Sequence, residues 1–267
     1  MTANLITSAS DPLPKPKPAS TDSFFFNLND YVKSRLLFDT LQLKVLPACR
    51  DSKDYLILVL DDFAAGLISN FCTTFELMEA GNIYQIEKLG LSRKRYPMSD
   101  VVYIVQPSQG SIQKVIEDFP AEDQFSFDQY GTVHLCFLTQ VPDERMQEIA
   151  RCPKLVGKVR TLVEVNLDFK VWQDNVFKFP CNVKQMTQLF DRDRTSAALV
   201  EKLSQKIFTV CSVMGEKPYI QYQSESPICE EVAMSVYKKL EYLYNYSGNG
   251  DSNKKKKGKK GQDSDHP

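Results

Sequence analysis

Tyr130–Phe169 reads YGTVHLCFLTQVPDERMQEIARCPKLVGKVRTLVEVNLDF, and this stretch decides the fold of the chain. An apolar run over Val133–Leu138 is followed by Pro142-Asp143, a typical helix start, and by a short amphipathic segment. A second run rich in β-branched residues, Thr161–Leu167, comes next. The pattern predicts one β-α-β unit, and its helix carries no catalytic group.

The same alternation of strand and helix begins upstream at Tyr55. Tyr55–Leu60 (YLILVL) is a continuous apolar run, which is typical of a strand covered on both faces. A predicted helix over Ala64–Ala80 follows, with Gly81 as its C-terminal stop. We therefore predict an α/β fold, a five-stranded, mainly parallel open sheet with helices on both faces. The other predicted elements are the strands Ile83–Ile86 and Val101–Val105, the helix Ser111–Phe119, and a helix over Leu28–Leu46 capped by Asn27.

Composition divides the chain into four parts. Residues 1–22 are rich in Pro, Ser and Lys and are expected to be disordered, whereas residues 23–170 form the α/β domain. Residues 171–247 contain two predicted helices around one strand, which cannot build a sheet alone, so we expect an incomplete second α/β segment. Residues 248–267 are expected to be a disordered Lys-rich tail. The helices of the second segment are Thr195–Met214 and Glu230–Tyr246, and its strand is Lys217–Tyr222.

Charge and cysteine usage exclude several function classes. The net charge is −1, and the tail is basic while the rest is slightly acidic, which does not favour nucleic acid as a partner. Seven cysteines occur without a CxxC pair, so we predict reduced thiols, no metal site and no cofactor. No signal peptide and no run of about 18 apolar residues is present, which favours a cytoplasmic location.

Signals for catalysis are weak. Asp61-Asp62 after the first strand is similar to the acidic pair of phosphate-accepting receiver domains, but Val105-Gln106-Pro107 lacks the third carboxylate. Capping of the next helix is the favoured role for Asp61 or Asp62. The chain has no glycine-rich phosphate loop and no GxSxG elbow, and His134 is expected to be a core residue. No catalytic residue is predicted. An α/β enzyme or a receiver-like signalling module remains the alternative to a binding protein.

Two basic segments allow more than one interpretation. Arg93-Lys94-Arg95 precedes the third strand and is either a solvated loop or a patch that faces a partner. The lysines from Lys254 onward are either a solubilising tail, a nuclear localisation signal or a contact for anionic lipid.

Several motifs in order resemble the SM (Sec/Munc-type) family, whose members bind syntaxins and govern vesicle fusion. LILVLDD (Leu56–Asp62) is similar to the family's first strand and the Asp that closes it. Ser92–Phe119 is similar to its basic loop, third strand and following helix, and KPYIQY (Lys217–Tyr222) to a later strand. The opening stretch follows the family's order as well. The resemblance covers about residues 50–247.

The resemblance implies a syntaxin-type SNARE as the partner and vesicle docking and fusion as the process. It implies an apolar pocket for a syntaxin N-terminal peptide, lined by Val141, Met146 and Leu162 with Glu164 beside it. It also implies a cleft for the closed helical bundle of a syntaxin. The chain would meet the membrane only indirectly, through its partner. The cleft residues would be Asp61, Ala65, Arg93, Lys94 and Arg95.

Family members continue well beyond this length, with a further strand and a large helical domain. We therefore expect the chain to be a truncated form or a gene fragment. Ala65 is smaller than the side chain that the family usually has next to the cleft.

Overall fold

The computed structural model describes residues 2–5, 27–49, 56–120, 128–179 and 197–255. The chain divides into two compact units. One unit is Pro16–Pro180, and the other joins Met1–Lys15 to Cys181–Pro267.

A five-stranded sheet is the centre of the first unit. Its spatial order is β3-β2-β4-β5-β6, and every neighbouring pair is parallel. The chain adds β3 on one side of β2 and then β4, β5 and β6 on the other side. The direction in which strands are added therefore reverses at β2, as in other doubly wound folds. The prediction of five parallel strands is therefore confirmed. The strands are β2 (Leu56–Leu60), β3 (Ile83–Lys88), β4 (Tyr96–Val105), β5 (Tyr130–Phe137) and β6 (Val159–Glu164).

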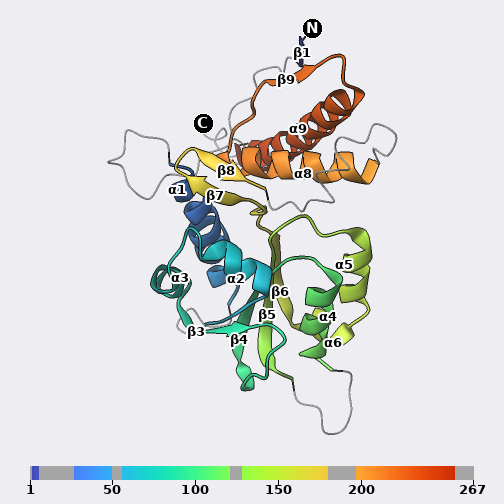
Figure 1. Cartoon of the computed structure of the whole chain (residues 1–267). Coiled ribbons are helices and arrows are strands. Elements are labelled where there is room, and N and C mark those ends of the chain that lie inside the picture. Colours follow the sequence, from blue (N-terminus) through green and yellow to red (C-terminus); the bar gives the residue numbers. More distant parts are fainter. Residues whose placement is uncertain (1, 6–26, 50–55, 121–127, 180–196, 256–267) are drawn as a thin grey trace, which may run out of the picture. The chain divides into compact units, whose positions relative to one another are not determined.

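Helices cover both faces of this sheet, as predicted (Figure 1). The N-terminal helices and the two helices after β2 lie on one side: α1 (Leu28–Lys33), the π-helical segment η1 (Ser34–Val45), the short η2 (Leu46–Ala48), α2 (Asp62–Ile68) and α3 (Thr74–Gly81). The other side carries α4 (Gln109–Glu117), α5 (Asp143–Ala150) and α6 (Pro153–Lys158).

Alternation along the central strands divides the core between the two helix layers. Tyr103 and Leu135 belong to the buried cluster that includes Ile112 of α4 and Ile149 of α5. Successive strand residues point to opposite faces, so Val102 and Ile104 face the other layer. All residues of β2 and β5 are buried, which explains their continuous apolar sequences.

The predicted single helix over Ala64–Ala80 is wrong, because the structure has two helices there. α2 ends at Ile68, and α3 starts after Thr73. Thr73 and Glu76 form a capping box: the Glu76 N–H donates to Thr73 Oγ1 at 3.2 Å, and the Thr73 N–H donates to Glu76 Oε2 at 2.8 Å. This local alternative to a continuous helix leaves Phe75 73% exposed.

Glu76→Gln should weaken the fold at neutral pH but not in acid. The ion pair with Lys33 (Nζ to Oε1, 2.8 Å) and the bonds from Thr73 lower the pKa of Glu76 to about 2. A carboxyl with a lowered folded-state pKa stabilises the fold above its unfolded pKa, and this contribution is lost as the pH falls through the folded value. Because the Glu76 side chain is 39% exposed, the effect should stay below about 1 kcal/mol.

Urea unfolding of wild type and Glu76→Gln should thus differ at pH 7, and the difference should shrink between pH 4.5 and about 2. Glu79→Gln, an exposed position on the same helix, should follow wild type throughout. A difference between wild type and Glu76→Gln that does not change over this range would contradict the assignment.

A β-hairpin closes the first unit. β7 (Lys170–Gln173) and β8 (Val176–Lys178) pair antiparallel, and the Leu28 N–H donates to the Asp174 carbonyl at 2.6 Å, which ties the hairpin to α1. The predicted boundary after residue 170 lies at the start of this hairpin, whereas the compact unit extends to Pro180. The division into domains stays a prediction.

The second unit has more regular structure at its ends than the sequence suggested. β1 (Thr2–Leu5) pairs antiparallel with β9 (Ile220–Gln223). The composition of residues 1–22 predicted disorder, but strand pairing uses the backbone N–H and C=O groups, which every residue except proline has. α9 (Pro227–Lys255) follows α8 (Ala197–Met214) and extends past Gly248, since adding residues to an existing helix needs no new nucleus. The rest of the two predicted disordered ends, Met1 and residues 6–22 and 256–267, lies outside the described residues.

None of the helices in the described ranges is both long enough and apolar enough to cross a membrane.

Candidate functional site

Asp61 lies at the carboxyl edge of the sheet, directly after β2. Its Oδ1 accepts a hydrogen bond from the Ala64 N–H at 2.8 Å, which caps α2. Its Oδ2 accepts from the Gln106 N–H at 2.8 Å and from the Ser111 hydroxyl at 2.7 Å. The side chain thus joins β2, the loop after β4 and the first turn of α4.

These contacts fit Asp61 for positioning and not for direct partner contact. The residue is only 8% exposed, and both of its oxygens accept hydrogen bonds from the protein. Ala65, one turn along α2, is exposed and can be reached by a partner. A receiver-type phosphate site would need Asp61 accessible and a carboxylate where Gln106 stands.

Arg93, expected in the same cleft, lies inside a buried network of charges. Its guanidinium donates to both Asp118 oxygens at 2.7 and 2.8 Å and to the Tyr130 hydroxyl at 3.2 Å. The Tyr103 hydroxyl donates to Asp118 at 2.6 Å, and the Tyr130 hydroxyl donates to Glu87 at 2.5 Å. The Arg93 and Asp118 side chains are 7% and 12% exposed.

The electrostatics of the network favour its charged form. Burial alone would lower the pKa of Arg93, but the hydrogen bonds and charge of Asp118 raise it. Burial first, and then the negative charge of Asp118, raises the pKa of the Tyr103 hydroxyl well above its ordinary value. Arg93 is therefore a structural cation, while Lys94 and Arg95 beside it are exposed.

The predicted cleft residues do not form one site. Tyr130, which contacts Arg93, begins β5, whereas Asp61 follows the last residue of β2. Because the strands are parallel, Tyr130 lies at the amino ends of the strands and Asp61 at their carboxyl ends. The two positions are roughly 20 Å apart for strands of this length. Ala65 and the pair Lys94 and Arg95 are consequently separate surfaces.

The predicted pocket residues do come together, at the β6 edge of the sheet. Oε1 of Glu164 accepts a hydrogen bond from the Val141 N–H at 2.8 Å, which joins the end of β6 to the residues before α5. Leu162 lies two residues before Glu164 on the same face, and Met146 of α5 packs against the core of that face. Val141 is buried, Met146 is half-buried, and Leu162 is 40% exposed.

Sequence reasoning did not identify the hydrogen-bond partners of Arg93 and Asp61, which determine whether these two side chains are buried. Asp118 and Glu87 surround Arg93 and Tyr130, and Ser111 holds Asp61. Asp118 follows the last residue of α4 and Arg93 precedes β4, so both positions belong to the amino edge of a parallel sheet. That placement is the signal that could have paired them.

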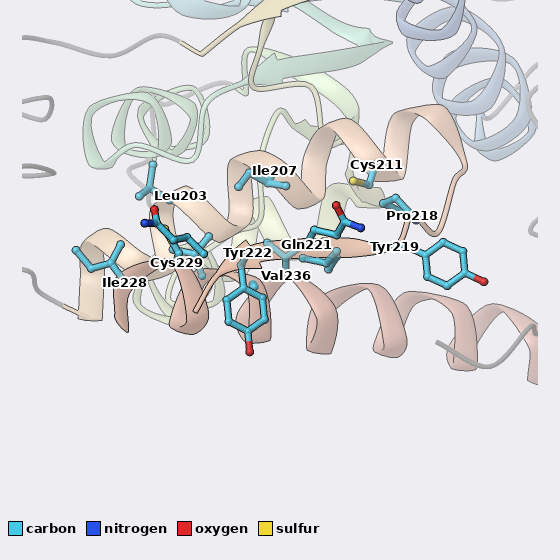
Figure 2. A pocket seen from close by; sticks show the side chains of 14 residues that line it. Leu203, Ile207, Cys211, Pro218, Tyr219, Gln221, Tyr222, Ile228, Cys229 and Val236 are labelled. Carbon is cyan, nitrogen blue, oxygen red and sulfur yellow. The ribbon is translucent and has the colours of Figure 1, made fainter. Parts of the chain in front are cut away.

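An apolar groove in the second unit was also missed. It has a volume of about 570 Å³ and lies between α8, β9 and α9. Figure 2 shows Leu203 and Ile207 of α8 opposite Val236 of α9, with Tyr222 of β9 beside them. The spacing of four residues along each helix (Leu203 and Ile207, Val232 and Val236) is the sequence signal for this groove.

The Sec1 family model matches residues 56–266, which include the five-stranded sheet and most of the second unit. The chain belongs to the Sec1 family. The resemblance to SM proteins is thereby confirmed. A relative from Dictyostelium discoideum, protein transport protein sec1, is 24% identical over 216 residues, which are 80% of this chain and 35% of the relative. The chain spans about a third of the length of the curated relatives that it matches.

Solved structures of Sec1-family proteins have the same fold. The Unc18–syntaxin 1 complex from Monosiga brevicollis matches with a TM-score of 0.67 and 28% identity, over 83% of this chain and 37% of that one. Sly1p in complex with an N-terminal peptide of Sed5p matches with a TM-score of 0.63 and 18% identity, over 83% and 39% of the two chains. The second likeness is one of fold alone.

Proposed function

We propose that this Sec1-family chain is a binding protein and not an enzyme. Its partner is a syntaxin-type SNARE, and its role is the regulation of vesicle docking and fusion in intracellular protein transport. The observation that carries the proposal is the group at the β6 edge, where exposed Leu162 shares a face of the sheet with Glu164 and Met146 packs against the core of that face. Family membership supports it, and so do the partners named for the solved relatives, a syntaxin and an N-terminal peptide of Sed5p.

The chemistry of the β6 edge suits a short peptide. Leu162 and Met146 offer apolar surface, and Glu164 adds one carboxylate beside it. A peptide with a hydrophobic anchor and a basic residue would bury its anchor against the first two and place its charge near the third. β6 is an edge strand, so the approach is not blocked by another strand of the sheet.

A second contact belongs to the same proposal. A closed helical bundle of the partner would pack on the exposed face of α2 around Ala65, and Asp61 would hold α2 in place from below. The chain would then reside in the cytoplasm and reach the membrane through the SNARE.

Leu162→Lys is expected to weaken binding of a syntaxin N-terminal peptide at least about 30-fold, the effect of losing a hot spot worth about 2 kcal/mol. The lysine removes the apolar contact and repels the basic residue of the peptide. Fluorescence titration with labelled N-terminal peptides from a panel of syntaxins would measure the affinity. Because Leu162 is 40% exposed, the variant should keep its fold.

Tyr84→Lys is the matched control. Tyr84 is 63% exposed on β3, the opposite edge strand, and its replacement should leave the affinity unchanged. Equal affinity of folded Leu162→Lys and wild type would place the peptide elsewhere. Binding of a phosphate analogue by wild type, with no peptide bound, would favour the receiver-like alternative instead.

A further inference from the structure

Three side chains with metal-binding atoms meet on the α1 side of the sheet. Cys49 Sγ, His134 Nε2 and an Asp100 carboxylate oxygen all lie within 4.8 Å of one another. Asp100 is 2% exposed and His134 0%, while Cys49 is half-buried. No other such group of three or more metal-binding side chains occurs in the described ranges of the chain.

The fold brings these residues together from distant parts of the sequence. Asp100 and His134 lie on the neighbouring central strands β4 and β5. In their register Val102 is opposite His134, so Asp100 and His134 point to the same face. Cys49 directly follows η2, in the helical layer that covers this face.

The separations within this group are close to those of ligands around one ion. His134 Nε2 lies 3.7 Å from Cys49 Sγ and 3.9 Å from Asp100 Oδ2. The distance to Asp100 exceeds the length of an N–H···O hydrogen bond, about 2.7–3.2 Å, whereas the distance to Cys49 is also compatible with a hydrogen bond to sulfur. Two ligands of a tetrahedral zinc, with bonds of about 2.0–2.3 Å, lie roughly 3.5 Å apart. The two distances from His134 exceed that separation by a few tenths of an ångström, and the Cys49 and Asp100 ligand atoms lie within 4.8 Å of each other.

Two threonines supply the polar surroundings that a metal site needs. His134 Nδ1 lies 3.0 Å from Thr161 Oγ1, and when this nitrogen donates to the hydroxyl, Nε2 keeps its lone pair for a metal. Thr132 Oγ1 is buried without a hydrogen-bond partner. Thr132 is opposite Asp100 in the strand register and two residues before His134, so it faces the same group.

We propose that Cys49, Asp100 and His134 bind a divalent zinc ion. The cysteine supplies a thiolate, His134 supplies Nε2 and Asp100 supplies a carboxylate oxygen. A water molecule completes the tetrahedron and satisfies the Thr132 hydroxyl. The ion fastens the segment after η2 to the two central strands, and its binding free energy adds to the stability of the unit. The mixed sulfur, nitrogen and oxygen set suits zinc.

Zinc titration of the metal-free full chain, under reducing conditions and against a chromophoric chelator, tests the site. Wild type should bind one zinc ion per chain and unfold at a higher temperature with zinc than without it. Cobalt in place of zinc should give the visible bands of tetrahedral coordination and a thiolate charge-transfer band. Cys49→Ser should lose the thiolate band and bind at least about 10-fold more weakly, as expected when a first ligand is lost.

Cys152→Ser and His266→Ala are the matched controls. Cys152 is also half-buried, and His266 is the only other histidine of the sequence, so both variants should bind zinc as wild type does. If Cys49→Ser does not fold, Thr161→Val provides the second test, with an expected loss of about 10- to 100-fold in affinity. Zinc affinity equal to wild type in both variants, or no zinc bound by wild type, would overturn the proposal.

Discussion

Asp118→Asn is expected to destabilise the unit Pro16–Pro180 by about 3–5 kcal/mol. The substitution keeps the shape of the side chain but removes the negative charge between Arg93 and the Tyr103 hydroxyl. Arg93, 7% exposed, then remains buried as a cation without its counter-charge. Leaving one member of a buried ion pair unpaired is among the costliest single substitutions, because its desolvation is no longer offset.

Native-state hydrogen exchange of the full chain would measure this loss at the backbone amides of β4 and β5. Lys94→Ala is the control, since Lys94 is adjacent to Arg93 but exposed, and it should change stability by less than about 0.5 kcal/mol. The double variant Arg93→Met/Asp118→Asn should lose less than the sum of the single variants. A loss below about 1 kcal/mol for Asp118→Asn would mean that solvent reaches the pair.

Asp61→Ala is expected to cost about 3 kcal/mol in the same unit. The change removes the cap of α2 and the acceptors of the Gln106 N–H and the Ser111 hydroxyl. Loss of a helix cap alone costs about 1 kcal/mol, and donors left without an acceptor near a buried edge add to it. Hydrogen exchange of the Ala64 and Gln106 amides, which donate to Asp61 in wild type, should become faster in the variant and would measure the loss of these bonds directly.

Asp62→Ala separates this role from that of a nearby surface charge. Asp62 forms an ion pair with Lys88 at 2.6 Å, but the two side chains are 78% and 49% exposed. Such pairs contribute about 0–1 kcal/mol, so this variant should be close to wild type. Equal losses for Asp61→Ala and Asp62→Ala would show that the edge depends on charge and not on the hydrogen bonds of Asp61.

Most of the first unit could be predicted from the sequence because its signals are local. Continuous apolar runs identify the buried strands β2 and β5, and Asn27 caps α1 through a bond from the Asn29 N–H, as predicted. The pocket residues were implied by the family resemblance and stay a prediction, and the structure places Val141, before α5, in contact with Glu164 at the end of β6. The break between α2 and α3 was missed because the apolar spacing hid the Thr73 capping box.

Charge roles could not be predicted in this way, because the partners of a charged group come from distant parts of the chain. Arg93 belonged to a basic triplet that suggested a surface, and Asp118, 25 residues later, decides that it is buried. Cys49 and His134 are 85 residues apart, and no spacing in the sequence connects them. Backbone periodicity determines which face a side chain takes, but the free energy of a buried charge depends on the groups that packing places around it. The sequence thus determined the sheet, and only the tertiary structure decided which polar residues are buried and which are exposed.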